Sequence, residues 1–232
     1  MFELLAALSV AALLQAADAP RHAIDEGIVH VRAAVEEPGK PAVDTRLDVY
    51  VRGAERVLCV FREGPQAGRR VLMVGDRVWL IVPGTKHAIS LSANQRLLGG
   101  ASIGDVARLR FAEEFTATLE PGEERIDEVP CRRLRLAAKT RRAAYAAGTL
   151  WIGAADDLPR RARLALRSGK EAKELRFLEF GRDHGKVVLQ RMEIRHLLAA
   201  ERGQVTRLEF TGYEPATLAP ELFDPQRARE LP

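Results

Sequence analysis

The sequence predicts a mainly β protein built on one antiparallel sheet with only a few short helices. Three observations carry this prediction: apolar and polar residues alternate in short segments, turn residues separate these segments at regular intervals, and helix-length periodicity is scarce after Pro20. Because 232 residues suit one large β domain, we expect a single domain over residues 20–232.

Residues 1–19 differ in composition from the rest of the chain. Residues 4–14 form an apolar run of signal-peptide length, and Ala17-Asp18-Ala19 is a small-residue cleavage pattern. We therefore predict a signal peptide over residues 1–19, which places the mature protein in the periplasm. Glu3 and Pro20 are atypical for such a segment, so an uncleaved anchor or a wrongly assigned start codon remains the alternative.

The alternating segments are the predicted strands, and they lie at residues 28–37, 46–52, 56–62, 70–74, 77–82, 88–92, 115–119, 131–138, 145–152, 161–167, 174–180, 187–198 and 204–213. Gly75-Asp76 joins two of them in a tight hairpin, and turn residues elsewhere favour a meander. Residues 78–82 are apolar on both faces, which predicts a central strand.

Two other segments are predicted to be helical. Ser102 with Asp105 resembles a capping box, so a helix is expected to continue through residues 106–114. Residues 220–225 read as a short helix or turn that packs Leu222 and Phe223 against the body of the domain.

Composition excludes several classes of function. The net charge is +4, but nearly every basic residue alternates with an apolar residue or lies beside an acid, which predicts a solvated sheet face and no nucleic-acid site. Cys59 and Cys131 lie in strand-like runs and are interpreted as buried free thiols, with a disulfide as the alternative. The five histidines lack metal-ligand spacing, and no metal or cofactor is expected.

Catalytic motifs are also absent from the sequence. It contains no Gly-x-Ser-x-Gly elbow, no Walker-type loop and no dinucleotide fingerprint. The acidic doublets read as solvated surface, because adjacent strand residues point to opposite faces. His196 shares a face with Ile194 and Leu198 and is interpreted as a core or rim histidine. We therefore predict that the protein is not an enzyme.

An ordered set of motifs resembles a known family. Trp79-Leu80-Ile81-Val82-Pro83-Gly84-Thr85 is followed by Ser92-Ala93-Asn94-Gln95-Arg96-Leu97-Leu98-Gly99-Gly100 and by Ser102-Ile103-Gly104-Asp105. This order is similar to that of the outer-membrane lipoprotein-sorting proteins, the LolA-like family. The resemblance implies a half-open antiparallel β-barrel whose apolar cavity takes up lipid or lipoprotein acyl chains beneath a helical lid or plug.

The resemblance also implies candidate residues and partners. Candidates for the lipid cavity are Val49, Val51, Trp79, Ile81, Leu134, Leu136, Leu164 and Leu166, and candidates for the lid are Arg96, Leu97, Leu98 and Ile103. The expected role is that of a monomeric carrier that serves outer-membrane lipoprotein sorting or an inner-membrane transporter of the RND or ABC type. The alternative is an envelope-sensing regulatory scaffold of the RseB type. That type carries a second C-terminal domain, and the present sequence ends soon after Phe223.

Overall fold

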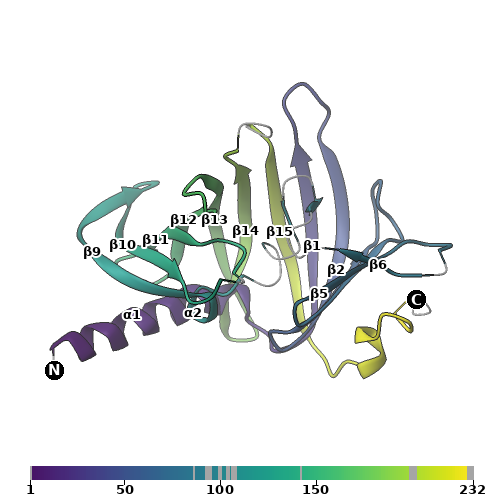
Figure 1. Cartoon of the computed structure of the whole chain (residues 1–232), viewed down its shortest axis with the longest axis horizontal. Helices are drawn as coiled ribbons and strands as arrows, with labels where there is room; N and C mark the ends of the chain where they lie inside the picture. The colour runs from purple at the N-terminus through teal and green to yellow at the C-terminus, as the bar shows by residue number, and fades with distance from the viewer. Residues whose placement is uncertain are drawn as a thin grey trace. The chain divides into compact units, whose positions relative to one another are not determined.

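The computed structural model describes residues 2–85, 87–91, 96–98, 101–102, 105, 109–141, 143–198 and 203–228. The chain divides into two compact units. Unit 1 comprises residues 1–22 and 109–203, and unit 2 comprises residues 23–108 and 204–232. Both are mainly β (Figure 1), as the alternating pattern predicts.

Unit 2 contains a run of antiparallel strands in the order β6-β5-β4-β3-β2-β1-β15. Their bounds are β1 Glu26–Glu36, β2 Val43–Arg52, β3 Arg56–Phe61, β4 Arg70–Val74, β5 Arg77–Ile81, β6 Ile89–Leu91 and β15 Val205–Pro215. The hairpin between β4 and β5 turns at Gly75, whose φ of 57° suits glycine. A second, two-stranded sheet pairs β7 (Arg96–Leu98) with β8 (Ala101–Ser102).

Two topological predictions need correction in unit 2. The last strand, β15, pairs with the first strand, β1, along nearly its whole length, a pairing that a simple meander does not contain. The strand predicted to be central, β5, has only the three-residue β6 beyond it in the strand order. Its apolar residues on both faces reflect cover from other segments, including the C-terminal one, because Ile81 packs with Leu218 and Phe223.

Unit 1 contains the antiparallel meander β14-β13-β12-β11-β10-β9 together with the N-terminal helix. Its elements are α1 Phe2–Asp18, η1 Ala19–Arg21, α2 Phe111–Glu114, β9 Phe115–Ile126, β10 Val129–Ala138, β11 Ala147–Gly153, β12 Pro159–Ala165, β13 Glu171–Asp183 and β14 Lys186–His196. Figure 1 shows α1, in purple, beside α2 and the strands of this unit.

The helix predicted to continue through residues 106–114 is confirmed at its end, where α2 spans Phe111–Glu114. Arg110 is extended, with φ −122° and ψ 110°, and residues 106–108 lie outside the described residues. The predicted C-terminal turn is confirmed: η4 (Pro220–Phe223) buries Phe223, and Leu222 packs beside it.

Cys59 and Cys131 are both buried and free, which confirms the interpretation of buried thiols. Burial raises the pKa of Cys59 to about 12 and also raises that of Cys131. Neither sulfur is therefore a nucleophile at neutral pH.

Candidate functional site

One face of the unit 1 sheet is formed by two rows of side chains that run across the strands. Paired residues in antiparallel strands point to the same face, and the pairing from β10 to β14 therefore defines each row. The leucine row consists of Leu134, Leu150, Ala162, Leu175 and Ile194, and the mixed row consists of Leu136, Gly148, Leu164, Lys173 and His196. Every member of the leucine row has 0% exposure, so this row is fully covered.

Helices α1 and α2 form the cover of this face. Phe111 of α2 packs edge-on against Phe177, with ring centroids 6.5 Å apart, and also contacts Phe115. Phe177 lies two residues after Leu175 on β13 and shares its face. Leu13 and Leu14 of α1 are buried as well. The apolar run predicted to be a leader thus contributes to the core of unit 1, whereas its removal as a signal peptide stays a prediction.

Asp18 joins the two helices of the cover. Its carboxylate accepts hydrogen bonds from the backbone N–H of Phe111 at 2.9 Å and of Ala112 at 2.8 Å. The first turn of a helix presents free N–H groups and favours negative charge, which explains why an acid is held there. Asp18 is only 6% exposed, and burial raises its pKa although these bonds and nearby arginines oppose the shift.

Two further side chains fix the entry to α2. Arg21 donates to the carbonyl of Leu109 at 3.0 Å, and its guanidinium lies 5.9 Å from the centroid of the Phe177 ring. Nε2 of His22 lies 3.2 Å from the same carbonyl. Burial and the neighbouring arginines lower the pKa of His22 to about 3, so this ring is neutral at neutral pH. Polar contacts around residues 18–22 therefore add to the apolar packing that holds the cover.

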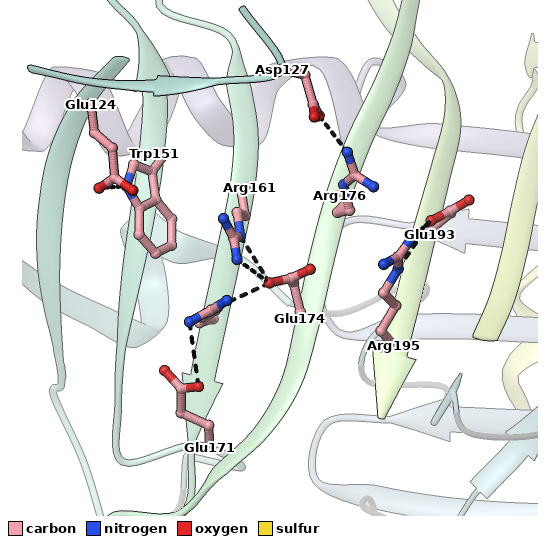
Figure 2. A network of polar contacts seen from close by, with 10 residues as sticks. Glu124, Asp127, Trp151, Arg161, Glu171, Glu174, Arg176, Glu193 and Arg195 are labelled. Carbon is pink, nitrogen blue, oxygen red and sulfur yellow. Dashed lines mark hydrogen bonds and ion pairs between the residues drawn. The ribbon is translucent and has the colours of Figure 1, made fainter. Parts of the chain in front are cut away.

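The opposite face of unit 1 carries a network of ion pairs, shown in Figure 2. Glu174 accepts hydrogen bonds from Arg161 at 2.8 Å and from Arg163 at 2.9 Å. Burial disfavours its charge, but these two bonds outweigh burial and hold the pKa of Glu174 below its usual value. The predicted alternation of arginine with apolar residues thus produces a polar outer face in which arginines and acids are paired.

Trp151 belongs to this outer face. Its indole N–H donates to Glu124 at 2.8 Å, and the guanidinium of Arg161 lies 5.2 Å from the ring centroid (Figure 2). The network continues toward β13 and β14, where Arg176 pairs with Asp127 and Arg195 with Glu193. The Arg195–Glu193 pair lies within β14, whereas the other contacts link different strands or a strand and a turn, so the network stabilises the sheet from outside.

The structure separates the residues predicted to line the lipid cavity. In unit 1, Leu134, Leu136 and Leu164 share the face beneath α1 and α2, and Leu166 lies half-buried just beyond β12. In unit 2, Val49 pairs with Cys59 and shares a face with Val51.

Trp79 and Ile81 lie on the other face of unit 2. Trp79 pairs with Leu72, and Leu72 pairs with Leu58. Leu58 comes directly before Cys59, the partner of Val49, so the Trp79 row points to the opposite face. Trp79 and Ile81 pack with Leu218 and Phe223 of the C-terminal segment. The four unit 2 candidates therefore do not line one common face.

The predicted lid is described only in part. Arg96, Leu97 and Leu98 form β7, and Ile103 lies outside the described residues. The cover observed in unit 1 includes α1, which the sequence assigned to a leader. Lys173 was also missed, because the strand was expected to begin at Glu174, whereas β13 begins at Glu171 and carries Lys173 onto the apolar face.

Within the described residues, no group of three or more His, Cys, Asp or Glu side chains is arranged to hold a metal ion. In the same part of the chain, none of the helices has the length and apolar character needed to span a bilayer.

Known structures share this fold. A LolA superfamily protein from Nitrosomonas europaea is 25% identical with a TM-score of 0.81, covering 93% of this chain and 97% of that one. A DUF1329 family protein from Desulfovibrio piger is 17% identical with a TM-score of 0.78, covering 94% and 97%. An outer membrane lipoprotein-sorting protein domain from Vibrio parahaemolyticus is 16% identical with a TM-score of 0.75, covering 96% and 99%. The protein is thus a LolA-like β protein, as its motifs predict.

The family follows from a sequence model. A protein-family model described as "Uncharacterized protein" matches residues 53–229, and the chain belongs to this LolA-like family. No curated protein sequence matches the chain.

Proposed function

We propose that the protein is a non-enzymatic carrier that binds the acyl chains of a lipid or lipoprotein on the apolar face of unit 1. The observation that carries this proposal is a fully apolar row of five strand residues, covered by two helices that a few polar contacts hold in place. The LolA-like fold supports the same function. An acyl chain would replace α1 and α2 as the cover of this face.

The hydrophobic effect is large enough for such an exchange. Burial of a long acyl chain contributes about 0.8 kcal/mol per CH₂, or about 12 kcal/mol for sixteen carbons before ordering costs. The cost is the loss of the contacts that α1 and α2 make with the sheet. The polar contacts around Asp18 and Arg21 add to that cost and so help to set the balance between the closed and loaded states.

In the cell, this carrier would act in the periplasm as a monomer, without a cofactor, and with residues 1–19 retained as an uncleaved segment, because α1 and Asp18 belong to the cover. Its acyl cargo would pass to the outer-membrane lipoprotein-sorting route or to an inner-membrane transporter of the RND or ABC type. The LolA-like fold and the motif order around residues 79–105 support this assignment.

Native mass spectrometry of the protein purified from cells without detergent tests the proposal. We expect an adduct with the mass of an acyl lipid on the wild type. Leu164→Gln should lose the adduct while circular dichroism still reports a folded sheet. Leu178→Gln is the matched control, because Leu178 is on the same sheet but 44% exposed. A wild type free of lipid, and unable to bind added palmitate, would contradict the proposal whether or not Leu164→Gln folds.

A further inference from the structure

The turns at the two ends of the unit 1 meander differ in charge. Successive strands of a meander run in opposite directions, so alternate turns gather at the same end of the sheet. At one end, which we call the basic end, the β10–β11 turn carries Lys139 and Arg141, and the β12–β13 turn carries Arg167 and Lys170. The turns at the other end contain or adjoin the acids Asp127, Glu128, Asp156, Asp157 and Asp183.

The acids at the far end all face basic side chains of the same unit. Asp127 pairs with Arg176 at 2.5 Å (Figure 2), and Glu128 pairs with Arg125 at 3.2 Å. The remaining pairs are Asp156 with Arg160, Asp157 with Arg132 and Asp183 with His184. The negative charge of the acidic turns is therefore largely balanced within unit 1.

The cations of the basic end are not balanced in this way. Arg141, Arg167 and Lys170 are exposed, and within the described part of the chain none of the three has a carboxylate partner. Lys139 donates to a neutral group, the carbonyl of Ala112, at 2.7 Å. Exposed positive charge therefore collects at this end.

The acids close to the basic end are already engaged. Glu171 pairs with Arg163 at 3.7 Å, and Glu113 pairs with Arg110 at the same distance. Glu114 also has a partner. The exposed cations of the two basic turns are thus available to an anion from outside the protein.

The two basic turns lie side by side. The N–H of Ala146, which follows the first turn, donates to the carbonyl of Ala165, which precedes the second, at 2.9 Å. Hairpins that are neighbours in a sheet place their turns about 10 Å apart, two strand spacings. This separation is close to the Debye length of about 8 Å at physiological salt, so the fields of the four cations add.

A bilayer that contains anionic lipid is the partner that this arrangement fits. Its negative charge is spread over a surface, so exposed cations on two turns can approach it together without a matched pocket. The basic end also adjoins the cover of the apolar face, because the N–H of Lys139 donates to the carbonyl of Glu114 at 2.8 Å. The turn that would approach the lipid headgroups therefore also holds the last residue of α2.

We propose that the basic end of unit 1 docks on an anionic membrane surface. Each Lys or Arg close to such a surface contributes about fivefold to the affinity, so four contribute roughly 600-fold. Binding of this kind is reversible and is weakened by salt, because it depends on exposed charges. The inference does not depend on the carrier function proposed above, and it adds the surface through which the protein meets a membrane.

Flotation of the full-length protein with unilamellar vesicles tests the proposal. One set of vesicles contains phosphatidylcholine alone, and the other contains about one-third phosphatidylglycerol. At about 0.05 M NaCl we expect the anionic vesicles to bind at least about tenfold more tightly than the neutral ones. At about 0.5 M NaCl, where the Debye length falls to about 4 Å, the preference should be lost.

Paired substitutions at the two ends of β13 locate the binding surface. Arg167→Gln with Lys170→Gln removes two cations of the basic end and should weaken binding to the anionic vesicles about 25-fold. The matched control is Arg182→Gln with Lys186→Gln, which removes the same charge from two exposed residues near the β13–β14 turn at the far end. This control should weaken binding by less than about twofold, and circular dichroism verifies that both variants are folded.

Three results would overturn the proposal. The first is equal binding of the wild type to both kinds of vesicle, and the second is an equal loss of binding in the two double variants. The third is binding to poly-L-glutamate without binding to the anionic vesicles, which would assign the basic end to an acidic protein partner. Each of these results leaves the carrier function standing, because that function is judged by the acyl-lipid adduct.

Discussion

Asp18 offers the most direct way to loosen the cover of unit 1. We expect Asp18→Asn to weaken the link between α1 and α2, because the amide can accept only one of the two backbone hydrogen bonds that the carboxylate now accepts at 2.9 and 2.8 Å. The other N–H would then face an NH₂ group. The acid is 6% exposed, so water does not readily replace the lost partner.

The size of the effect follows from two opposing terms. Hydrogen bonds to a charged group contribute about 1.5–3 kcal/mol each, whereas the neutral amide avoids the cost of burying a charge, the same cost that raises the pKa of Asp18. We therefore expect a net loss of about 1–2 kcal/mol in the free energy of unfolding. If that loss falls on the cover alone, the open state becomes about tenfold more populated.

Two assays at pH 7 check this prediction. Urea unfolding followed by circular dichroism gives the change in stability, and stopped-flow displacement of N-phenylnaphthylamine gives the rate at which palmitate enters. Asp18→Asn should enter the unfolding transition at lower urea and take up palmitate faster. Glu113→Gln is the control on the same helix, because Glu113 is 59% exposed and should change stability by less than about 0.5 kcal/mol. Unchanged stability and unchanged uptake in Asp18→Asn would refute the role of Asp18 as the link.

Three other substitutions probe the remaining polar contacts. Glu174→Gln should lower the free energy of unfolding by about 2 kcal/mol at pH 7, which is less than for a fully buried pair because Arg161 is partly solvated. Glu171 is exposed, so the control Glu171→Gln should lower it by under about 0.5 kcal/mol. Equal losses of stability in the two variants would contradict the outer-face network. The lowered pKa of Glu174 makes its contribution present above pH 4.5 and lost as the pH falls through the folded value. His22 in the unfolded chain takes up a proton below about pH 6.5, while the folded ring stays neutral to about pH 3. Between pH 7 and pH 5 the wild type should therefore lose about 2 kcal/mol more of its free energy of unfolding than His22→Gln. Identical pH dependence of the two proteins in urea unfolding would be inconsistent with this. His30 behaves in the opposite way. Burial lowers its pKa, but contacts with the carboxylates of Asp48 and Glu214 outweigh burial and raise it. The stabilisation that these contacts give is therefore present below the unfolded pKa and is lost as the pH rises through the folded pKa. His30→Gln should therefore cost more at pH 6 than at pH 9, and thermal melts showing the reverse order would exclude this.

Strand positions were predictable from the sequence because alternation and turn residues are local signals. The β4–β5 hairpin follows from Gly75-Asp76, and both strands begin at the predicted residues. Strand β9 was predicted to end at residue 119 but continues to Ile126, past Pro121 and Gly122. Its register with β10 shifts there, and a bulge with Gly122 at φ +85° absorbs residues that would stop a regular strand.

The candidate site was only partly predictable, because which face is covered depends on distant segments. Alternation correctly placed Leu134, Leu136 and Leu164 on one face, but it could not show that Trp79 lies on the face covered by the C-terminal segment. An apolar run such as residues 4–14 reads the same as a leader and as a buried helix. The distinguishing signal was Asp18, an acid at the end of that run, where it binds the first turn of α2.

Lys173 and Glu174 show how one strand serves two requirements at once. Consecutive residues of β13 point to opposite faces, so Lys173 faces the covered apolar side and Glu174 binds the arginines outside. A sheet that exchanges a helical cover for an acyl chain loses and regains its inner contacts, and strand spacing must then be maintained from the outer face. We infer that the ion pairs of Figure 2 provide this support. Glu174→Gln should accordingly weaken folding and leave the binding of palmitate unchanged, whereas lost binding would show that the two faces are not independent.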